Sequence, residues 1–188
     1  MSPAPPGATA KRAAFTLLEL LAVITIVAIL AGLMLGVGRR ASEAGKISRA
    51  KAELAALSAA LESYRRTYGD YPRTDDEARL LQSLLGKIGP RDVLINGRAL
   101  LETARFVIAR PASPDTPADS FSETGAVLLD PWSQPYVYVY KVPAGGWTNS
   151  GYVLYSLGPD GKDTPALLPG GINDSTPREN ADNLHANR

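Results

Sequence analysis

The chain has 188 residues, of which 20 are basic and 19 acidic, so its formal net charge is +1. This length accommodates one ordinary domain of about 100–150 residues together with a membrane segment. No long block of basic residues is present, which argues against nucleic-acid binding. The sequence contains no cysteine, which excludes disulfides, thiolate catalysis and cysteine-ligated metal sites.

The first feature along the chain is an apolar stretch that follows Lys11 and Arg12. Residues Leu20–Val37 contain neither a charge nor a proline, and a helix of about 20 apolar residues can span a bilayer. A cleavable secretory signal is the competing interpretation, although its apolar region is shorter, about 7–15 residues. Arg39 and Arg40 follow the stretch, so basic residues flank both ends and charge alone leaves the orientation open.

Glu19 is the one acid at the start of this stretch. A carboxylate in hydrocarbon costs several kcal/mol unless a partner or water relieves it, so Glu19 is a candidate functional residue. The alternative is that Glu19, one turn inside the span, reaches the membrane interface. Residues 36–41 match the G-x-G-x-x-A spacing of a dinucleotide fingerprint. The apolar run before them is too long for a strand and no second apolar strand follows, so we reject a nucleotide site.

Beyond Arg40, apolar residues alternate at spacings of three and four, which predicts one buried stripe along a helix. The stripe comprises Ile47, Ala50, Leu54, Leu57, Leu61, Tyr64 and Tyr68. Charged residues such as Lys46, Arg49 and Glu53 are expected on the other faces. Gly69 and Pro72 predict the end of the helix near Tyr68.

The rest of the chain predicts a short helix followed by a small antiparallel sheet. Thr74–Glu77 has the pattern of a capping box, and Leu80, Leu81, Leu84 and Leu85 form the buried face, with Gly86 as the stop. Residues 97–109 fit either a helix or a helix-to-strand passage. The stretches AVLLD, QPYVYVYK and GYVLYSLG read as strands, in which Tyr136, Tyr138 and Tyr140 alternate with Val137 and Val139. The apolar face of the sheet is expected to pack on the helical stripe.

The C-terminal region is rich in oxygen-bearing side chains and poor in apolar ones. It holds Asp160, Asp163, Asp174, Glu179, Asn180 and Asp182. Converging oxygen ligands suit calcium, which accepts six to eight of them in flexible geometry. The alternative from the residues alone is a solvated acidic tail.

Catalytic motifs are missing from the sequence. Its one histidine, His185, lies among polar residues near the C-terminus, and Ser133 and Ser156 stand outside any nucleophile-elbow pattern. We therefore expect a protein that is not an enzyme.

The N-terminal motif AFTLLEL, followed by an apolar helix that becomes amphipathic, resembles the type IV pilin and type II secretion pseudopilin family. The resemblance extends through DPWSQPYVY and YSLGPDG, which are similar to signatures of its major pseudopilins, and through ENADNL near the end. It leaves out residues 87–125, which look like an insertion. In the first of these motifs, Asp130 is expected to cap a turn and Trp132 to lie in the core.

The resemblance implies an α+β pilin-like fold, in which a long N-terminal helix packs on a small antiparallel head. The implied parts are a cleaved leader (1–14), a transmembrane and assembly helix (15–38), its amphipathic continuation (39–68) and a periplasmic head (69–188). A prepilin peptidase would cut between Ala14 and Phe15, and Phe15 would be N-methylated. The family usually has Gly where Ala14 stands, and many members have Pro where Gly36 stands.

The resemblance also implies a function without chemistry. The chain would be anchored once in the bacterial inner membrane and would form a homo-oligomeric filament with other pseudopilins, on an inner-membrane assembly platform. Glu19 would meet the freed amino group of Phe15 in a neighbouring copy, because pairing offsets the cost of burying both charges. The alternatives are a type IV pilus subunit for adhesion or motility, and a signal-anchored periplasmic binding protein.

The resemblance further implies a calcium ion in the C-terminal loop. Its ligands would be the carbonyl of Leu157 and the side chains of Asp160 and Asp182, with Asn180 as a fourth where the family often has an acid. Because the chain has no disulfide, such an ion would stabilise the head.

Overall fold

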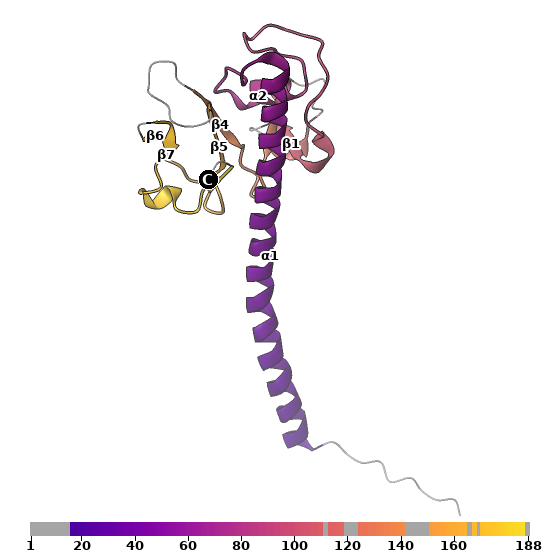
Figure 1. The fold of residues 1–188 in the computed structure, drawn as a ribbon. Helices are drawn as coiled ribbons and strands as arrows, with labels where there is room; N and C mark the ends of the chain where they lie inside the picture. The colour runs from indigo at the N-terminus through magenta and orange to yellow at the C-terminus, as the bar shows by residue number, and fades with distance from the viewer. Residues whose placement is uncertain are drawn as a thin grey trace, which may run out of the picture. The chain divides into compact units, whose positions relative to one another are not determined.

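The computed structural model describes residues 16–110, 113–118, 124–141, 151–164, 167–168 and 170–186, of which 33–39 and 173 are described by their backbone only. The chain divides into two compact units, residues 1–43 and 44–188. One helix, α1 (Leu17–Tyr68), contributes its first half to the first unit and its second half to the second. The second unit, which we call the head, contains every other helix and strand that the structure describes (Figure 1).

The second half of α1 follows the predicted pattern closely. Ala50, Leu54, Leu57, Leu61 and Tyr64 are at most 1% exposed, whereas Ile47 and Tyr68 at the two ends of the stripe are half-buried. Glu53 departs from the prediction, since it is buried although it was expected on a solvated face. The helix ends at Tyr68 as predicted, and Gly69 follows with φ +84°, the left-handed conformation that glycine adopts without strain.

Helix α2 (Glu77–Leu84) confirms the predicted short helix but starts with a different cap. Asp76 is the N-cap, and its side chain accepts a hydrogen bond from the Arg79 amide at 2.8 Å. Thr74 instead accepts a bond from the amide of Asp76, so the predicted capping box at Thr74 is wrong by two residues. A carboxylate accepts hydrogen bonds at least as well as a hydroxyl, and Asp76 stands next to the first helical residue. The four predicted leucines are buried.

Residues 97–109, for which the sequence fitted either a helix or a helix-to-strand passage, contain a short helical turn and most of a strand. A 3-10 turn, η1 (Thr103–Arg105), leads into β1 (Val107–Arg110), which pairs antiparallel with β2 (Ser113–Pro117) and with β3 (Val127–Leu129). Part of the expected insertion at 87–125 therefore belongs to a sheet of the head.

A second three-stranded sheet has the order β4 (Val137–Tyr140), β5 (Tyr152–Ser156), β8 (Leu184–His185) and is antiparallel throughout. The three predicted strands are thus confirmed, but they fall in two sheets, because β3 ends in a tight turn before β4 begins. A small hairpin of β6 (Leu167–Leu168) and β7 (Ile172–Asn173) and a 3-10 turn, η2 (Arg178–Asn180), complete the head.

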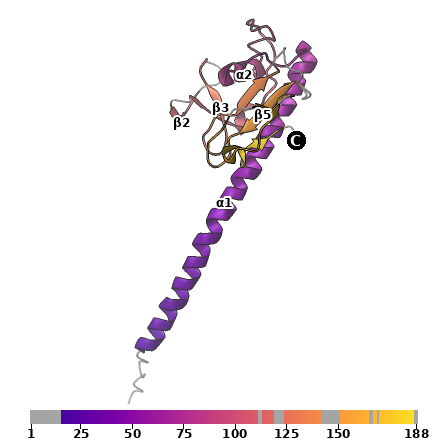
Figure 2. The ribbon, with the colours of Figure 1, turned by 90° about the vertical axis from the view of Figure 1, so that its left-hand side faces the viewer.

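The core lies between α1, α2 and the strands. Its largest buried cluster combines leucines and Tyr64 of α1 with the leucines of α2, with Tyr138, Tyr152 and Leu154 from the second sheet, and with Tyr136 just before that sheet. Figure 2 shows β5 beside the second half of α1. The predicted alternation holds for Tyr136 and Tyr138, which are each 1% exposed while Val137 and Val139 are half-buried. It does not extend to Tyr140, which is half-buried like the valines. The α+β fold predicted from the sequence is confirmed.

Candidate functional site

The start of α1 holds the candidate assembly residue. Thr16 precedes the helix, and both its hydroxyl oxygen and its carbonyl accept hydrogen bonds from the amide of Glu19, at 3.2 and 3.1 Å. Thr16 therefore caps the helix, and Glu19 stands at the third helical position, where an acid interacts favourably with the helix dipole. The sequence analysis missed this role, although the spacing Thr16-x-x-Glu19 is the signal for it.

On both sides of Glu19, the first unit exposes a series of large apolar side chains. Its most exposed member is Leu17 at 82%, and its least exposed is Leu30 at 51%. The series comprises Leu17, Leu18, Leu20, Leu21, Val23, Ile24, Ile26, Val27, Ile29 and Leu30. Apolar surface of this extent marks a region that lipid or another protein covers. We call it the apolar series.

Two of the sequence predictions at this end reach residues that the structure does not describe. The predicted cleavage site at Ala14 and Phe15 lies outside the described residues, and the predicted span Leu20–Val37 includes side chains of 33–39, which also lie outside them. Among the described residues, no helix is both long and apolar enough to cross a membrane.

The C-terminal loop brings together two of the predicted calcium ligands. Oδ2 of Asp182 accepts a hydrogen bond from the amide of Asp160 at 3.1 Å. Gly158, next to Leu157, has φ +71°, and a Cβ there would lie only 2.4 Å from the carbonyl oxygen of Asp182. The two chain segments therefore approach closely because position 158 has no side chain. Around them, the described residues include no group of three or more His, Cys, Asp or Glu side chains that could hold a metal ion.

Asn180, the fourth predicted ligand, has protein partners for both ends of its amide. Its Oδ1 accepts from the amide of Thr164 at 2.8 Å, and its Nδ2 donates to the carbonyls of Thr164 and Asp174 at 3.0 and 2.7 Å. Its side chain is 2% exposed. Asn180 therefore joins two segments of the loop to η2.

Asp163, which the sequence analysis left open as a ligand, contacts the second sheet instead. Its Oδ2 accepts a hydrogen bond from the hydroxyl of Tyr155 at 2.6 Å. Burial raises the pKa of Tyr155, and the bond to Asp163 raises it further. The tyrosine therefore stays protonated and keeps donating to the carboxylate at neutral pH. On the neighbouring strand β8, the ring centroid of His185, the cross-strand partner of Tyr155, lies 5.4 Å from that of Tyr155.

Comparisons with known proteins give matches to the N-terminal motif and to most of the chain. The model of the prokaryotic N-terminal methylation motif matches residues 9–35. The chain is 28% identical over 153 residues to a protein of Pseudomonas aeruginosa named type II secretion system core protein G, covering 81% of this chain and 87% of that one. A protein of Escherichia coli K12 with the same name is 28% identical over 158 residues, covering 82% of this chain and 87% of that one. The chain is thus similar over most of its length to type II secretion core proteins G and carries the prokaryotic N-terminal methylation motif. No solved structure gives a significant match.

The DPW motif of this chain forms the turn that joins its two three-stranded sheets. Oδ1 of Asp130 accepts from the amides of Trp132 and Gln134, each at 2.9 Å, and Oδ2 accepts from the hydroxyl of Ser156 at 2.5 Å. The prediction that Asp130 caps a turn is confirmed. The prediction for Trp132 is wrong, since its side chain is only half-buried, because it belongs to the turn itself and turns lie at the surface.

The head also contains a buried acid, Glu53, that was expected on a solvated face. Oε1 of Glu53 accepts from Nε of Arg49 at 2.7 Å, and Oε2 accepts from the hydroxyl of Tyr136 at 2.6 Å. Glu53 is 5% exposed. Its position directly beside Leu54, at the edge of the apolar stripe, was the available signal. The acid links the second half of α1 to the residue just before β4, so it holds that part of the helix against the second sheet.

Proposed function

We infer that this protein is a structural subunit of a pseudopilus, the periplasmic filament of type II protein secretion. The observation that carries the inference is the exposed apolar series at the start of α1, in a chain whose head has a buried core of its own. Side chains that are 51–82% exposed in the single chain need a cover of lipid before assembly and of neighbouring helices after it. The relatives named core protein G of this secretion system support the assignment.

The filament is proposed to assemble through a charge pair at the start of α1. A prepilin peptidase removes residues 1–14 by cutting between Ala14 and Phe15, and the new amino group of Phe15 is methylated. That amine then meets the carboxylate of Glu19 in an adjacent copy. Burying both charges as a pair costs far less than burying either one alone. The match of residues 9–35 to the methylation motif supports this processing.

The apolar series is further proposed to anchor the chain in the bacterial inner membrane before assembly. The chain crosses once, with the leader in the cytoplasm and the head in the periplasm. Other pseudopilins and an inner-membrane assembly platform are the expected partners. The protein acts as a structural subunit and is not an enzyme. Its relatives are named as core proteins of the secretion system.

A calcium ion in the C-terminal loop is part of this proposal. The carbonyl of Leu157 and the carboxylates of Asp160 and Asp182 would hold it, because the hydrogen bond between Asp160 and Asp182 already places their segments side by side. Asn180 would stabilise the loop through its hydrogen bonds to Thr164 and to the carbonyl of Asp174. The ion would supply positive charge between two acids that otherwise repel each other.

An intact-mass measurement tests the processing step. The full chain, extracted from membranes of cells that express a type II secretion system, should lack residues 1–14 and carry one added methyl group. The matched control is the same chain from cells without the prepilin peptidase, which should keep Met1 or Ser2 as its first residue. A chain that retains its leader in the presence of the peptidase would contradict the proposal, since no amine at Phe15 would form.

A further inference from the structure

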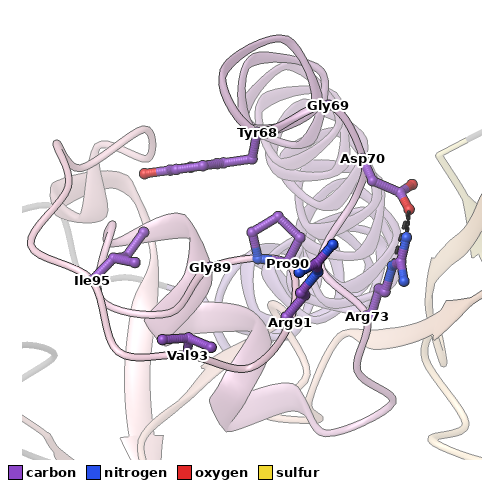
Figure 3. A pocket seen from close by; sticks show the side chains of 9 residues that line it. All are labelled: Tyr68, Gly69, Asp70, Arg73, Gly89, Pro90, Arg91, Val93 and Ile95. Carbon is purple, nitrogen blue, oxygen red and sulfur yellow. Dashed lines mark hydrogen bonds and ion pairs between the residues drawn. The ribbon is translucent and has the colours of Figure 1, made fainter.

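A pocket of about 530 Å³ opens at the C-terminal end of α1, between that end and the loop that follows α2. One side of it is apolar and is formed by Tyr68, Val93 and Ile95 (Figure 3). Val93 is 59% exposed. This side of the pocket therefore offers a partly uncovered hydrophobic surface beside an aromatic ring.

The opposite side of the pocket is charged. Asp70 and Arg73 form an ion pair at 2.8 Å, and the same carboxylate oxygen accepts from the hydroxyl of Tyr140 at 2.8 Å. Arg91 also lies on this side (Figure 3) and makes no ion pair with any residue that the structure describes. With Asp70 neutralised by Arg73, the pocket keeps one spare positive charge, on Arg91.

The loop that carries Arg91 is held in place before any partner binds. The amide of Gly89 donates to the carbonyl of Val93 at 2.9 Å, and the amide of Ile95 donates to the carbonyl of Lys87 at 2.8 Å. At its tip, Asp92 pairs with Arg79 of α2 at 2.9 Å. A preformed pocket loses little conformational entropy on binding.

A complementary feature lies elsewhere on the head, on the β6–β7 hairpin. Leu168 and Ile172 are cross-strand partners and are 44% and 53% exposed. Directly opposite residues of two strands lie on the same face, and so do residues two apart on one strand. Asp174 directly follows β7, two residues after Ile172, and adds a carboxylate at the end of the hairpin. We call Leu168, Ile172 and Asp174 the hairpin face.

The acid of the hairpin face is also fixed in position. Oδ1 of Asp174 accepts from the amide of Thr176 at 2.9 Å, and its backbone carbonyl accepts from Nδ2 of Asn180 at 2.7 Å. Bonds from the side chain and the amide of Thr176 lower the pKa of Asp174. The side chain of Asp174 is half-buried and so is partly open to a partner from outside.

We propose that the hairpin face of one copy docks in the α1-end pocket of the next copy, with Ile172 against Val93 and Ile95 and with Asp174 against Arg91. The inference rests on the proposed filament and identifies a contact between its heads. Apolar and charged groups stand side by side in both surfaces, so one approach satisfies both. Because the two surfaces are different parts of the head, the contact is head-to-tail, and repeated contacts of this kind give an open helical filament instead of a closed dimer.

A charge swap tests the contact in cells that assemble filaments of the full chain. Arg91→Glu places two acids together and should lower the fraction of chain in sedimented filaments about tenfold, as expected when a well-placed pair becomes repulsive. Asp174→Arg alone should lower it similarly, and the double variant should recover at least half of the loss. Arg98→Glu, an exposed site outside the pocket, is the matched control and should assemble normally.

Cross-linking supplies an independent readout, because the chain has no cysteine of its own. A chain carrying both Val93→Cys and Ile172→Cys should form disulfide-linked ladders in filaments, whereas each single variant should give no product larger than a dimer. Normal assembly of Arg91→Glu, or failure of the double swap to recover together with the absence of ladders, would overturn the contact. If wild type itself forms no filament, the proposed function fails; if wild type assembles and the swap has no effect, only this contact fails.

Discussion

The hydroxyl of Tyr136 donates a hydrogen bond to Oε2 of Glu53 at 2.6 Å, across 83 residues of sequence. The tyrosine is on the approach to β4 and the acid on α1, and both side chains are buried. Burial raises the pKa of Tyr136, and the bond to Glu53 raises it further, so the hydroxyl remains a donor throughout the physiological range. This bond fastens the second half of α1 to the rest of the head.

Replacing Tyr136 by Phe should lower the free energy of unfolding of the head by about 2–3 kcal/mol, because a buried carboxylate loses one of its two donors. Tyr138→Phe is the matched control, since Tyr138 is equally buried but donates to the neutral carbonyl of Pro72. It should cost only about 1 kcal/mol. Chemical denaturation of the full chain in detergent measures both, and equal losses would contradict the special role of the charged acceptor.

Asp130 should make the head less stable as the pH rises. Burial raises the pKa of this carboxyl, although hydrogen bonds from Ser156, Gln134 and Trp132 oppose the shift. The folded head therefore keeps the proton to a higher pH than the unfolded chain does. As the pH increases above the unfolded value of 3.8, the unfolded state ionises first, and stability falls until the pH passes the raised folded pKa.

The pH dependence can be isolated with Asp130→Asn, which keeps the shape and cannot ionise. The difference in free energy of unfolding, wild type minus variant, should decrease as the pH rises from about 3.8. Asp70→Asn provides a control of opposite sign. Burial acts to raise the pKa of Asp70, but bonds from Tyr140, Arg73 and the amide of Tyr71 outweigh it and lower the pKa. Wild type should therefore gain stability relative to Asp70→Asn as the pH rises through that lowered value.

Glu19 should be required for assembly through its charge and not through its effect on the helix start. Glu19→Gln keeps the size of the side chain but cannot neutralise an amine, so the chain should insert and fold yet be lost from filaments. Thr16→Ala removes only the hydroxyl that caps the amide of Glu19, a change of about 1 kcal/mol in helix stability. It should leave assembly nearly intact. Similar defects in both variants, measured by filament sedimentation, would assign Glu19 to helix capping.

Removal of calcium should lower the melting temperature of the head. An ion present at about 100 times its dissociation constant adds about 2.7 kcal/mol of stability, which corresponds to roughly 5–10 °C for a chain of this size. Scanning calorimetry with and without a chelator measures the shift. In Asp160→Ala and Asp182→Ala the chelator should have little effect, whereas the exposed-site variant Asp115→Ala should respond like wild type. A melting temperature that is indifferent to chelator would reject the metal.

Much of the fold follows from short-range patterns in the sequence. The stripe from Ala50 to Tyr64 could be read from spacing, because burial on one face of a helix imposes a period of 3.6 residues. The strand at Val137–Tyr140 could be read from its alternation, and the end of α1 from Gly69 and Pro72. Each of these signals lies within a few residues of the structure that it predicts.

The sequence predictions were wrong where the contacts that a residue makes, and not its type alone, decided its position or role. Thr74 and Asp76 are both good caps, and the start of α2 selected the nearer one. Trp132 has a side chain suited to a core, but its turn faces outward. For Glu53, charge alone suggested solvent, and only Arg49 and Tyr136 explain its burial.

By itself, the sequence determined that an apolar helix with one acid near its start leads into a half-buried helix and a small β-rich head, because these features depend on periodicity and composition. Tertiary structure alone decided which distant groups meet: Asp160 with Asp182, Asn180 with Thr164, and the loop of Arg91 with the end of α1. The physical reason is that such contacts depend on how the chain closes its loops. No local pattern encodes which side chains that closure brings within hydrogen-bonding distance.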